Sequence, residues 1–470
     1  MRSIFFLFAC LFCSFMVVAQ SLPQKLATAV QQFEADAQMK YAIFSLYVAD
    51  ARTGTLVYEH NSNVGLAPAS TQKLFTSAAA FELLGQGFRY KTGIGYNGKI
   101  EKGVLTGDLH INGSGDPTLG SWRWKDTKPD SVLNRIVAIL KANKITKIDG
   151  RILLNDSVFS IQPIPGGWIW DDIGNYYGAG CWGINWRENQ YDLLLKPGKV
   201  EGELTSIAGT NPDFQAEDLI NLITTGKKGS GDNGYIYTSP YATFGFAQGT
   251  IPLGDTFKIS GAITNPPVQF SSELQMALHK QKIDHDGPLK IYIAKVANKR
   301  SWPVMQETLG ELLSPPLDSI NYWFLRRSIN LYGEALLKTL VSQKGEKGVT
   351  TEQGVELVRN FWQQQGIDRA AIHIMDGSGL SPQNRVTTRS LVQVLQYAKT
   401  RPWYSSFYNC LPEYNGMKMK SGSVGGARAF AGYHTGKDGK EYIYAIIVNN
   451  YDGAAGEAVK KMYKVLDVLK

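Results

Sequence analysis

A serine and a lysine that stand one helical turn apart are the first candidates for catalysis. A serine hydroxyl becomes a nucleophile when a base lies within hydrogen-bonding reach, and residues i and i+3 of a helix share one face. Ser70-Thr71-Gln72-Lys73 meets this requirement, and no other serine of the chain has a lysine three positions later. The spacing alone is common in proteins, so its meaning depends on partners elsewhere in the chain.

Two further motifs supply such partners. Ser-x-x-Lys acts together with a Ser-x-Asn and a Lys-[Ser/Thr]-Gly in penicillin-binding enzymes and serine β-lactamases. The chain offers two of each, Ser319-Ile320-Asn321 or Ser328-Ile329-Asn330, and Lys91-Thr92-Gly93 or Lys420-Ser421-Gly422. We choose Ser328 because it opens an apolar helical pattern, whereas Ser319 follows two prolines in an expected loop. We choose Lys420 because Lys91 comes too early to be the third motif, and because 420–428 precedes a strand whose edge can lie beside a peptide.

With these motifs the chain resembles the peptidase S13 family, which are D-alanyl-D-alanine carboxypeptidases with endopeptidase activity. The resemblance covers nearly the whole chain after residue 19 and includes a long insertion between the first two motifs. Further blocks similar to the family's lie at 67–73, 107–119, 168–173, 177–179, 376–381 and 420–423. Two positions depart from the usual pattern, since Ser421 stands where Thr is more usual and Ile329 where Asp is common.

The resemblance and the chemistry together imply the roles of the catalytic residues. Ser70 would attack the carbonyl of the penultimate D-Ala, and Lys73 would take its proton if burial and the nearby Lys420 lower the pKa of Lys73. Ser328 would relay a proton to the leaving amine, and Asn330 would hold Lys73 or the substrate amide. Which group acts as the base stays open at this stage.

The third motif is expected to bind substrate. Lys420 with the hydroxyls of Ser421 and Ser423, around Gly422, would bind the terminal carboxylate. The backbone N–H groups of Ser70 and Ser423 would form the oxyanion hole.

Two residues are candidates for recognising the stem peptide of peptidoglycan. Asp172 would pair with a free ammonium on the third residue of that peptide, and Arg385 with an adjoining carboxylate. Asp172 could instead serve only to cap a turn.

The elements around the motifs predict an α/β fold. Strands are expected at 41–49 and 55–58, a helix at 70–84 that ends at Gly85, helices at 320–340 and 351–365, and strands at 429–433 and 442–448 before a last helix at 456–469. Between them, short alternating runs broken by Gly, Pro, Asn and Asp surround one helix at 131–141. We therefore predict a penicillin-binding, β-lactamase-like transpeptidase domain, an antiparallel sheet with helices, split by a long and mostly β insertion. Its residues are 20–87 and 288–470, and the insertion, at 88–287, is interpreted as two nested β-rich domains.

The N-terminal segment and the composition indicate where the protein is located and which partners suit it. Arg2 and the apolar run 4–19 predict a secretory signal peptide at 1–19. The run is too short to span a bilayer, so no stable membrane span is expected and the location is periplasmic or otherwise extracytoplasmic. The net charge of +8 comes without a long basic run, which argues against nucleic acid and suits anionic envelope polymers. Cys181 and Cys410, the cysteines that remain, could pair but are favoured as buried thiols.

Several classes of function are excluded, and others are kept as alternatives. No His-Glu-x-x-His or Gly-x-Ser-x-Gly occurs, which argues against a zinc peptidase and an α/β-hydrolase, and no cofactor or metal is expected. The expected partners are peptidoglycan stem peptides and β-lactam antibiotics. A β-lactamase and a non-catalytic envelope-binding protein are the alternatives. Glu334 and Asp376 are interpreted as ordinary polar residues, although Asp376 could also face substrate, and the tryptophans at 168, 170, 182 and 186 as core residues rather than a sugar platform.

Overall fold

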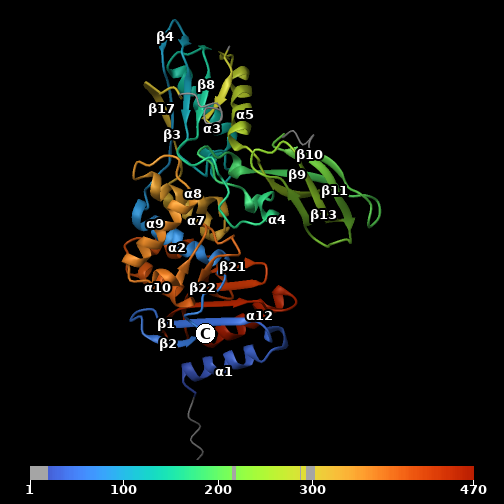
Figure 1. The fold of residues 1–470 in the computed structure, drawn as a ribbon, viewed down its shortest axis with the longest axis vertical. Helices are drawn as coiled ribbons and strands as arrows, with labels where there is room; N and C mark the ends of the chain where they lie inside the picture. Colours follow the sequence, from blue (N-terminus) through green and yellow to red (C-terminus); the bar gives the residue numbers. More distant parts are fainter. Residues whose placement is uncertain (1–19, 214–218, 286, 293–301) are drawn as a thin grey trace, which may run out of the picture.

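The computed structural model describes residues 20–213, 219–285, 287–292 and 302–470. The predicted signal peptide at 1–19 lies outside the described residues. Figure 1 shows the chain as a stack, with both ends of the described chain in the same sheet-and-helix layer and the insertion extending from the other side of the helices.

An antiparallel sheet joins the two ends of the chain. Its strands follow the order β2-β1-β23-β22-β21-β20, so the N-terminal hairpin pairs with the C-terminal strands through β1 and β23. The bounds are β1 Ile43–Asp50, β2 Leu56–His60, β20 Glu413–Tyr414, β21 Met417–Val424, β22 Ala427–Thr435 and β23 Glu441–Asn449. The predicted split of one α/β domain by an insertion is confirmed.

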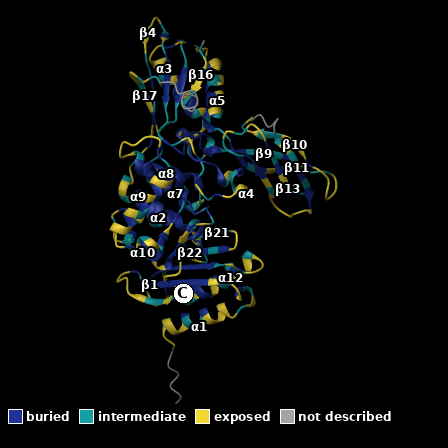
Figure 2. Ribbon diagram, viewed as in Figure 1, coloured by how far each residue is buried: buried dark blue, intermediate teal, exposed yellow. Residues whose placement is uncertain are grey.

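Helices cover both faces of this sheet, which explains the unbroken apolar run in β23. Alternate residues of a strand point to opposite faces. Tyr444 and Ile446 pack against α1 and α12, whereas Ala445 and Ile447 pack in the cluster formed by the helices of the other face. The two helices of the first face are α1 Leu22–Glu34 and α12 Ala455–Leu466, and those of the other are α2 Lys73–Leu84, α7 Leu317–Arg326, α8 Asn330–Ser342, α9 Thr351–Gln364, α10 Thr388–Lys399 and α11 Tyr404–Cys410. Figure 2 shows the buried strands between these layers.

The insertion forms two bodies, each with its own apolar core. In the first, a four-stranded and a five-stranded sheet pack with two helices. Its elements are β3 Lys91–Tyr96, β4 Lys99–Glu101, β5 Val104–Thr106, β6 Leu109–Asn112, α3 Pro129–Ala142, β7 Lys147–Asp149, β8 Ile152–Asn155, α5 Pro266–Lys280, β15 Asp284–His285, β16 Leu289–Ile291 and β17 Glu307–Leu313.

The second body consists of two three-stranded sheets. One has the order β10-β9-β14 and the other β11-β13-β12. Their bounds are β9 Gln190–Lys196, β10 Ser206–Asn211, β11 Leu219–Gly226, β12 Asn233–Tyr237, β13 Gly245–Pro252 and β14 Phe257–Ala262.

Two predicted boundaries are wrong. The insertion does not end at 287, because β16 pairs with β8 and β17 pairs with β3 along its full length, which extends the inserted fold to Leu313. The helix predicted at 320–340 is two helices, α7 and α8, with a break at 327–329. Ser328 lies in that break with a positive φ of 57°, a conformation that interrupts a helix.

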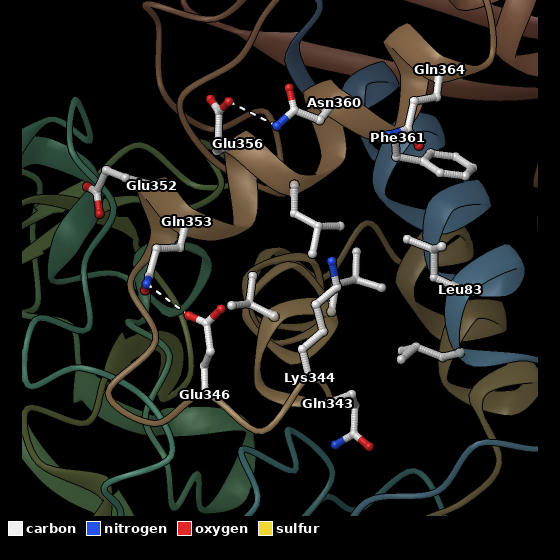
Figure 3. A pocket seen from close by; sticks show the side chains of 14 residues that line it. Leu83, Gln343, Lys344, Glu346, Glu352, Gln353, Glu356, Asn360, Phe361 and Gln364 are labelled. Carbon is white, nitrogen blue, oxygen red and sulfur yellow. Dashed lines mark hydrogen bonds between the residues drawn. The ribbon is translucent and has the colours of Figure 1, made fainter.

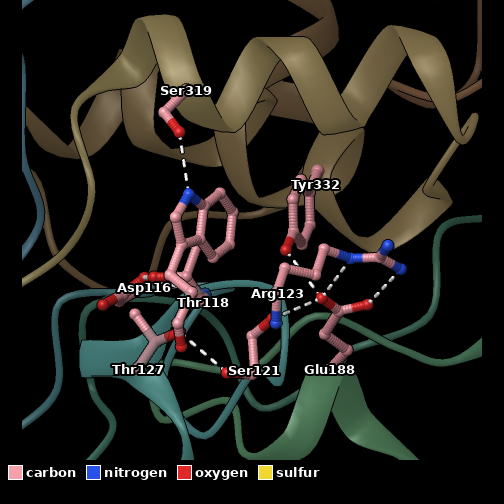
Figure 4. Close-up of polar contacts among 9 residues, drawn as sticks. Asp116, Thr118, Ser121, Arg123, Thr127, Glu188, Ser319 and Tyr332 are labelled. Carbon is pink, nitrogen blue, oxygen red and sulfur yellow. Dashed lines mark hydrogen bonds and ion pairs between the residues drawn. The ribbon is translucent and has the colours of Figure 1, made fainter.

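A buried ion pair within the insertion accepts a hydrogen bond from α8 (Figure 4). Three consecutive left-handed residues, Arg187, Glu188 and Asn189, turn the carboxylate of Glu188 inward. Arg123 Nε donates to Glu188 Oε1 at 2.7 Å, and Tyr332 Oη of α8 donates to the same oxygen at 2.8 Å. A buried charge that keeps two such partners holds its surroundings in one arrangement, so the insertion is anchored close to the start of α8.

Candidate active site

The nucleophile turn places Ser70 beside Lys73. Ala69–Gln72 forms a 3-10 turn (η2) that leads directly into α2, which ends at Gly85 as predicted. Lys73 Nζ lies 2.9 Å from Ser70 Oγ, and the Lys73 side chain is fully buried. Ala69, directly before the serine, has a positive φ of 46°, so the turn carries local strain at the reacting group.

Two oxygens that can only accept hydrogen bonds hold the amine of Lys73. Lys73 Nζ donates to Asn330 Oδ1 at 2.7 Å and to the Ser378 carbonyl at 2.6 Å. The orientation of the Asn330 amide is fixed because its Nδ2 donates to the Tyr177 carbonyl at 2.7 Å. Asn330 is the first residue of α8, so the helix start positions this contact.

Burial lowers the pKa of Lys73 to about 7, while the negative charges of Asp376 and Glu334 raise it. Lys420 was predicted to contribute to this lowering, and burial is its main cause. Burial and then the charge of Lys73 also lower the pKa of Lys420, because neighbouring cations disfavour each other's charged form. Near neutral pH a large share of Lys73 is therefore the free amine.

Ser328 and Lys420 form a second pair at the site. Lys420 Nζ donates to Ser328 Oγ at 3.0 Å and to the Ser421 carbonyl at 2.9 Å. The lysine is buried, and within the described ranges no carboxylate forms an ion pair with it. An anionic ligand would stabilise a buried ammonium group that has no carboxylate partner.

The strand that carries Lys420 lies directly against the nucleophile turn. A Cβ on Gly422 would stand 2.4 Å from the Pro68 carbonyl oxygen and 3.2 Å from Ala69 Cβ, so only glycine permits this approach. The short β20 pairs with β21 only at Met417 and Lys418. Among the described residues, no strand pairs with the outer edge of β21 from 420 to 424, where Ser421, Gly422 and Ser423 lie.

Two acidic residues that the sequence suggested were ordinary are central to the site. Asp376 is fully buried and accepts hydrogen bonds from Gln72 Nε2, Trp168 Nε1 and Asn384 Nδ2 and from two backbone N–H groups. It thereby fixes the loop that offers the Ser378 carbonyl to Lys73.

Glu334, one turn beyond Asn330 on α8, is also fully buried. Both of its oxygens accept from the Gly377 N–H at 3.1 Å. Burial and the charge of Asp376 raise the pKa of Glu334 to about 8. The only sequence signal for either residue was the small-residue block at 376–381, because their partners come from distant parts of the chain.

Asp172 lies near the site, whereas Arg385 has no hydrogen bond to Ser70, Lys73, Ser328 or Lys420 among the described residues. Asp172 belongs to the short helix α4 Trp170–Ile173, and its carboxylate bonds the hydroxyl of Tyr177, whose carbonyl holds Asn330. Burial raises the pKa of Asp172 to about 6. Arg385 is exposed and donates to the carbonyls of Pro382 and Asn384.

The rejected copies of the motifs lie elsewhere. Ser319 is within α7 rather than in the expected loop, and its hydroxyl accepts from Trp124 Nε1 at 2.8 Å (Figure 4). Lys91 is exposed at the start of β3 and pairs with Glu311. Neither has a hydrogen bond to Ser70 or Lys73 among those the structure shows.

The cysteines, possible metal ligands, helix lengths and pockets of the described residues complete the picture of the site's surroundings. Cys181 and Cys410 are free and buried, as favoured from the sequence. No group of three metal-ligating side chains occurs in the described part of the chain, and no helix within it is long and apolar enough to cross a membrane. A groove of about 880 Å³ lies between α2, α8 and α9 (Figure 3), but none of the candidate site residues lines it.

Comparisons with known proteins agree with this arrangement. Residues 26–413 match the model of the D-Ala-D-Ala carboxypeptidase 3 (S13) family. The chain is 24% identical over 429 residues to the D-alanyl-D-alanine carboxypeptidase DacB of Haemophilus influenzae, covering 84% of this chain and 83% of that protein. It is 26% identical over 454 residues to the D-alanyl-D-alanine carboxypeptidase of Actinomadura sp. strain R39, covering 90% and 81%.

The fold matches a solved structure over almost the full length. Penicillin binding protein 4 (dacB) from Haemophilus influenzae superposes with a TM-score of 0.78 at 22% identity and covers 94% of this chain and 98% of that one. A second structure of that protein, complexed with a β-lactam, gives a TM-score of 0.74 at 20% identity, covering 95% and 99%. From the family match over most of its length, the chain belongs to the D-Ala-D-Ala carboxypeptidase 3 (S13) family and is a serine-type D-Ala-D-Ala carboxypeptidase.

Proposed function

We propose that Ser70 is the acylated nucleophile and that Lys73 is its base. The observation that carries this is the set of partners around Lys73 Nζ. A neutral amine has two N–H groups and one lone pair, and the Asn330 and Ser378 oxygens can only accept. Both N–H groups are therefore used, and the lone pair is left to face the third neighbour, Ser70 Oγ. The free amine is thus held ready to remove the serine proton.

The reaction then runs as acyl transfer. Ser70 Oγ bonds to the carbonyl carbon of the penultimate D-Ala while its proton passes to Lys73 Nζ. When the peptide bond breaks, Ser328 Oγ gives its proton to the leaving D-Ala nitrogen and takes one from Lys420 Nζ, its hydrogen-bond donor. Water then attacks the acyl-enzyme and gives up one proton through Ser328 to Lys420, while Lys73 returns its proton to Ser70 Oγ as the shortened peptide leaves.

Substrate binding is assigned to the open edge of β21. Lys420 and the hydroxyls of Ser421 and Ser423 take the terminal carboxylate, which supplies the counter-charge that the buried Lys420 lacks. The backbone N–H groups of Ser70 and Ser423 form the oxyanion hole. An extended peptide added to this edge would run past the nucleophile turn, since Gly422 brings the strand against that turn.

The proposal extends to the finer function that the family resemblance and the predicted signal peptide imply. We assign to the chain DD-endopeptidase activity on peptidoglycan cross-links, acylation by penicillins, and a periplasmic or extracytoplasmic location. Asp172, beside Tyr177 at the cleft wall, pairs with a free ammonium on the third stem residue, while Arg385 stays the weaker candidate for an adjoining carboxylate.

Labelling with a fluorescent penicillin tests the proposal. We expect one labelled peptide, which contains Ser70, and no label on a Ser70→Ala variant. A label that persists in this variant, or that maps to another serine, would overturn the assignment. Release of the label within seconds would instead favour a β-lactamase. Wild-type protein that is folded but takes up no label would favour a non-catalytic role.

A further inference from the structure

Within the described ranges, one face of the sheet β11-β13-β12 is largely uncovered although it carries large apolar side chains, and Tyr237 on this face is buried against the rings of Trp170 and Phe246. Its inner face packs the second body of the insertion with Ile223, Ile236 and Ala247. The residues between them point the other way. Of these, Ile220 and Leu222 of β11 are 48% and 50% exposed, and Tyr235 of β12 is 44% exposed. We call this surface the outer face.

The strand register arranges the outer face in two rows. Ile220 pairs with Phe246, which pairs with Tyr237, and the rings of Phe246 and Tyr237 stack with centroids 4.8 Å apart. In the second row Leu222 pairs with Gln248, which pairs with Tyr235. Three strands set these side chains across about 10 Å.

The first row continues into residues 170–177, the segment that carries Asp172 and Tyr177. The ring of Trp170, which is 48% exposed, lies 5.9 Å from that of Tyr237. The outer face therefore adjoins residues 170–177, and the Tyr177 carbonyl of that segment accepts from Asn330 of the active site.

This connection is rigid. The Ile236 N–H of β12 donates to Asn175 Oδ1 at 3.1 Å, and the Ala262 N–H of β14 donates to the Gly174 carbonyl at 2.9 Å. The Tyr177 carbonyl accepts from Asn330 of the catalytic site. Figure 1 shows α4 between the helices that carry the site and the β9–β14 body.

The chemistry of the outer face selects an uncharged ligand. The side chains that point outward from the three strands are Ile220, Leu222 and Thr224, Asn233, Tyr235 and Tyr237, and Phe246, Gln248 and Thr250. None carries a charge, and an exposed apolar patch of this kind marks a binding surface. Sugar rings suit it, because a pyranose has an apolar C–H face for an aromatic ring and hydroxyl or amide groups for Gln248 and the Tyr235 hydroxyl.

We propose that the outer face binds the glycan strand of peptidoglycan, a chain of N-acetylated hexosamines, and so guides the attached stem peptide into the cleft. The identity of the glycan rests on the proposed function, because the stem peptide of that substrate is covalently joined to its sugar chain. Binding itself requires no catalysis, so its failure can be told apart from failure of acylation at Ser70.

The first test is binding of a peptide-free β-1,4-linked N-acetylglucosamine oligomer, measured by calorimetry on the full chain. We expect the affinity to fall at least tenfold in Tyr235→Ala and in Trp170→Ala. Tyr235→Phe and Trp170→Phe keep a ring and should retain most of it. Trp122→Ala is the matched control, since Trp122 is 49% exposed but lies outside the outer face, and it should bind as wild type does.

The second test is the ratio of kcat/KM on a disaccharide-linked pentapeptide to that on the free pentapeptide. We expect this ratio to fall at least fivefold in Tyr235→Ala. Wild-type protein that does not bind the oligomer, or an Ala variant that binds it fully, overturns the proposal. Tyr235-dependent binding to neutral or anionic lipid vesicles without binding to the oligomer also overturns it, in favour of a lipid surface.

Discussion

Replacing Gly422 by Ala tests whether the approach of β21 to the nucleophile turn sets the rate of acylation. The new Cβ would stand 2.4 Å from the Pro68 carbonyl oxygen, a backbone atom that cannot rotate away. An ordinary contact needs about 3.4 Å, so the strand and the turn must separate by about 1 Å. A misplacement of about 1 Å at reacting groups costs about 100-fold in rate. We therefore expect penicillin acylation of Gly422→Ala to be about 100-fold slower.

The assay is the second-order rate of labelling by a fluorescent penicillin, with thermal unfolding measured beside it. Overpacking at one site costs about 1–3 kcal/mol, so the variant should remain folded at 25 °C. Gly425→Ala is the matched control, because a Cβ on Gly425 meets nothing within 4 Å, and it should react at the wild-type rate. A Gly422→Ala protein that acylates as fast as Gly425→Ala would refute the reasoning.

Three further outcomes are expected. Lys73→Met should abolish acylation because the base is lost, whereas Lys91→Met should leave the rate within a factor of about two; equal losses would show that the wrong lysine has been assigned. The pKa of Lys73 is lowered to about 7, and the free amine is the base. The acylation rate of the wild-type protein should therefore fall about tenfold per pH unit below pH 7 and level off above it. A rate that does not depend on pH from 5 to 8 would exclude Lys73 as the base. Asp172→Asn should lower kcat/KM for a stem peptide with a free side-chain amine at least tenfold more than it lowers the rate of benzylpenicillin acylation. This difference should shrink below pH 6, where the wild-type Asp172 becomes protonated. Equal losses in both reactions would show that Asp172 has a structural role.

The residues that meet at the site could be predicted where the chemistry is local. The spacing of Ser70 and Lys73 needs only one helical turn, and the order of the three motifs was enough to choose Lys420 over Lys91. The choice of Asn330 over Asn321 rested on a loop expected around Ser319, where the structure has helix α7. The structure joins Ser70, Lys73 and Asn330 by hydrogen bonds, and it joins Lys420 to Ser328 in a second pair.

The rest depended on contacts between distant parts of the chain. Asp376 shows no local pattern that reveals its partners, since Gln72 and Trp168 lie more than 200 positions away from it. The end of the insertion at Leu313 follows from pairing of β17 with β3, and propensity cannot show which strand another will join. The sequence did not reveal the break at Ser328, because the apolar periodicity of α7 continues into α8 without interruption.

The position of β23 between β1 and β22 determines when the enzyme can first exist during synthesis. The strand that follows the N-terminal helix has no sheet partner except β2 until the last thirty or so residues have been made. Even the backbone just before Ser70 depends on this, because the Ala67 N–H donates to Asn449 Oδ1 at 2.7 Å. Such long-range pairing folds slowly, whereas the two bodies of the insertion can close around contacts made earlier. A truncated or unfinished chain therefore carries Ser70 and Lys73 but no sheet to bring Lys420 to them, and the hydrolase becomes active only as a finished molecule.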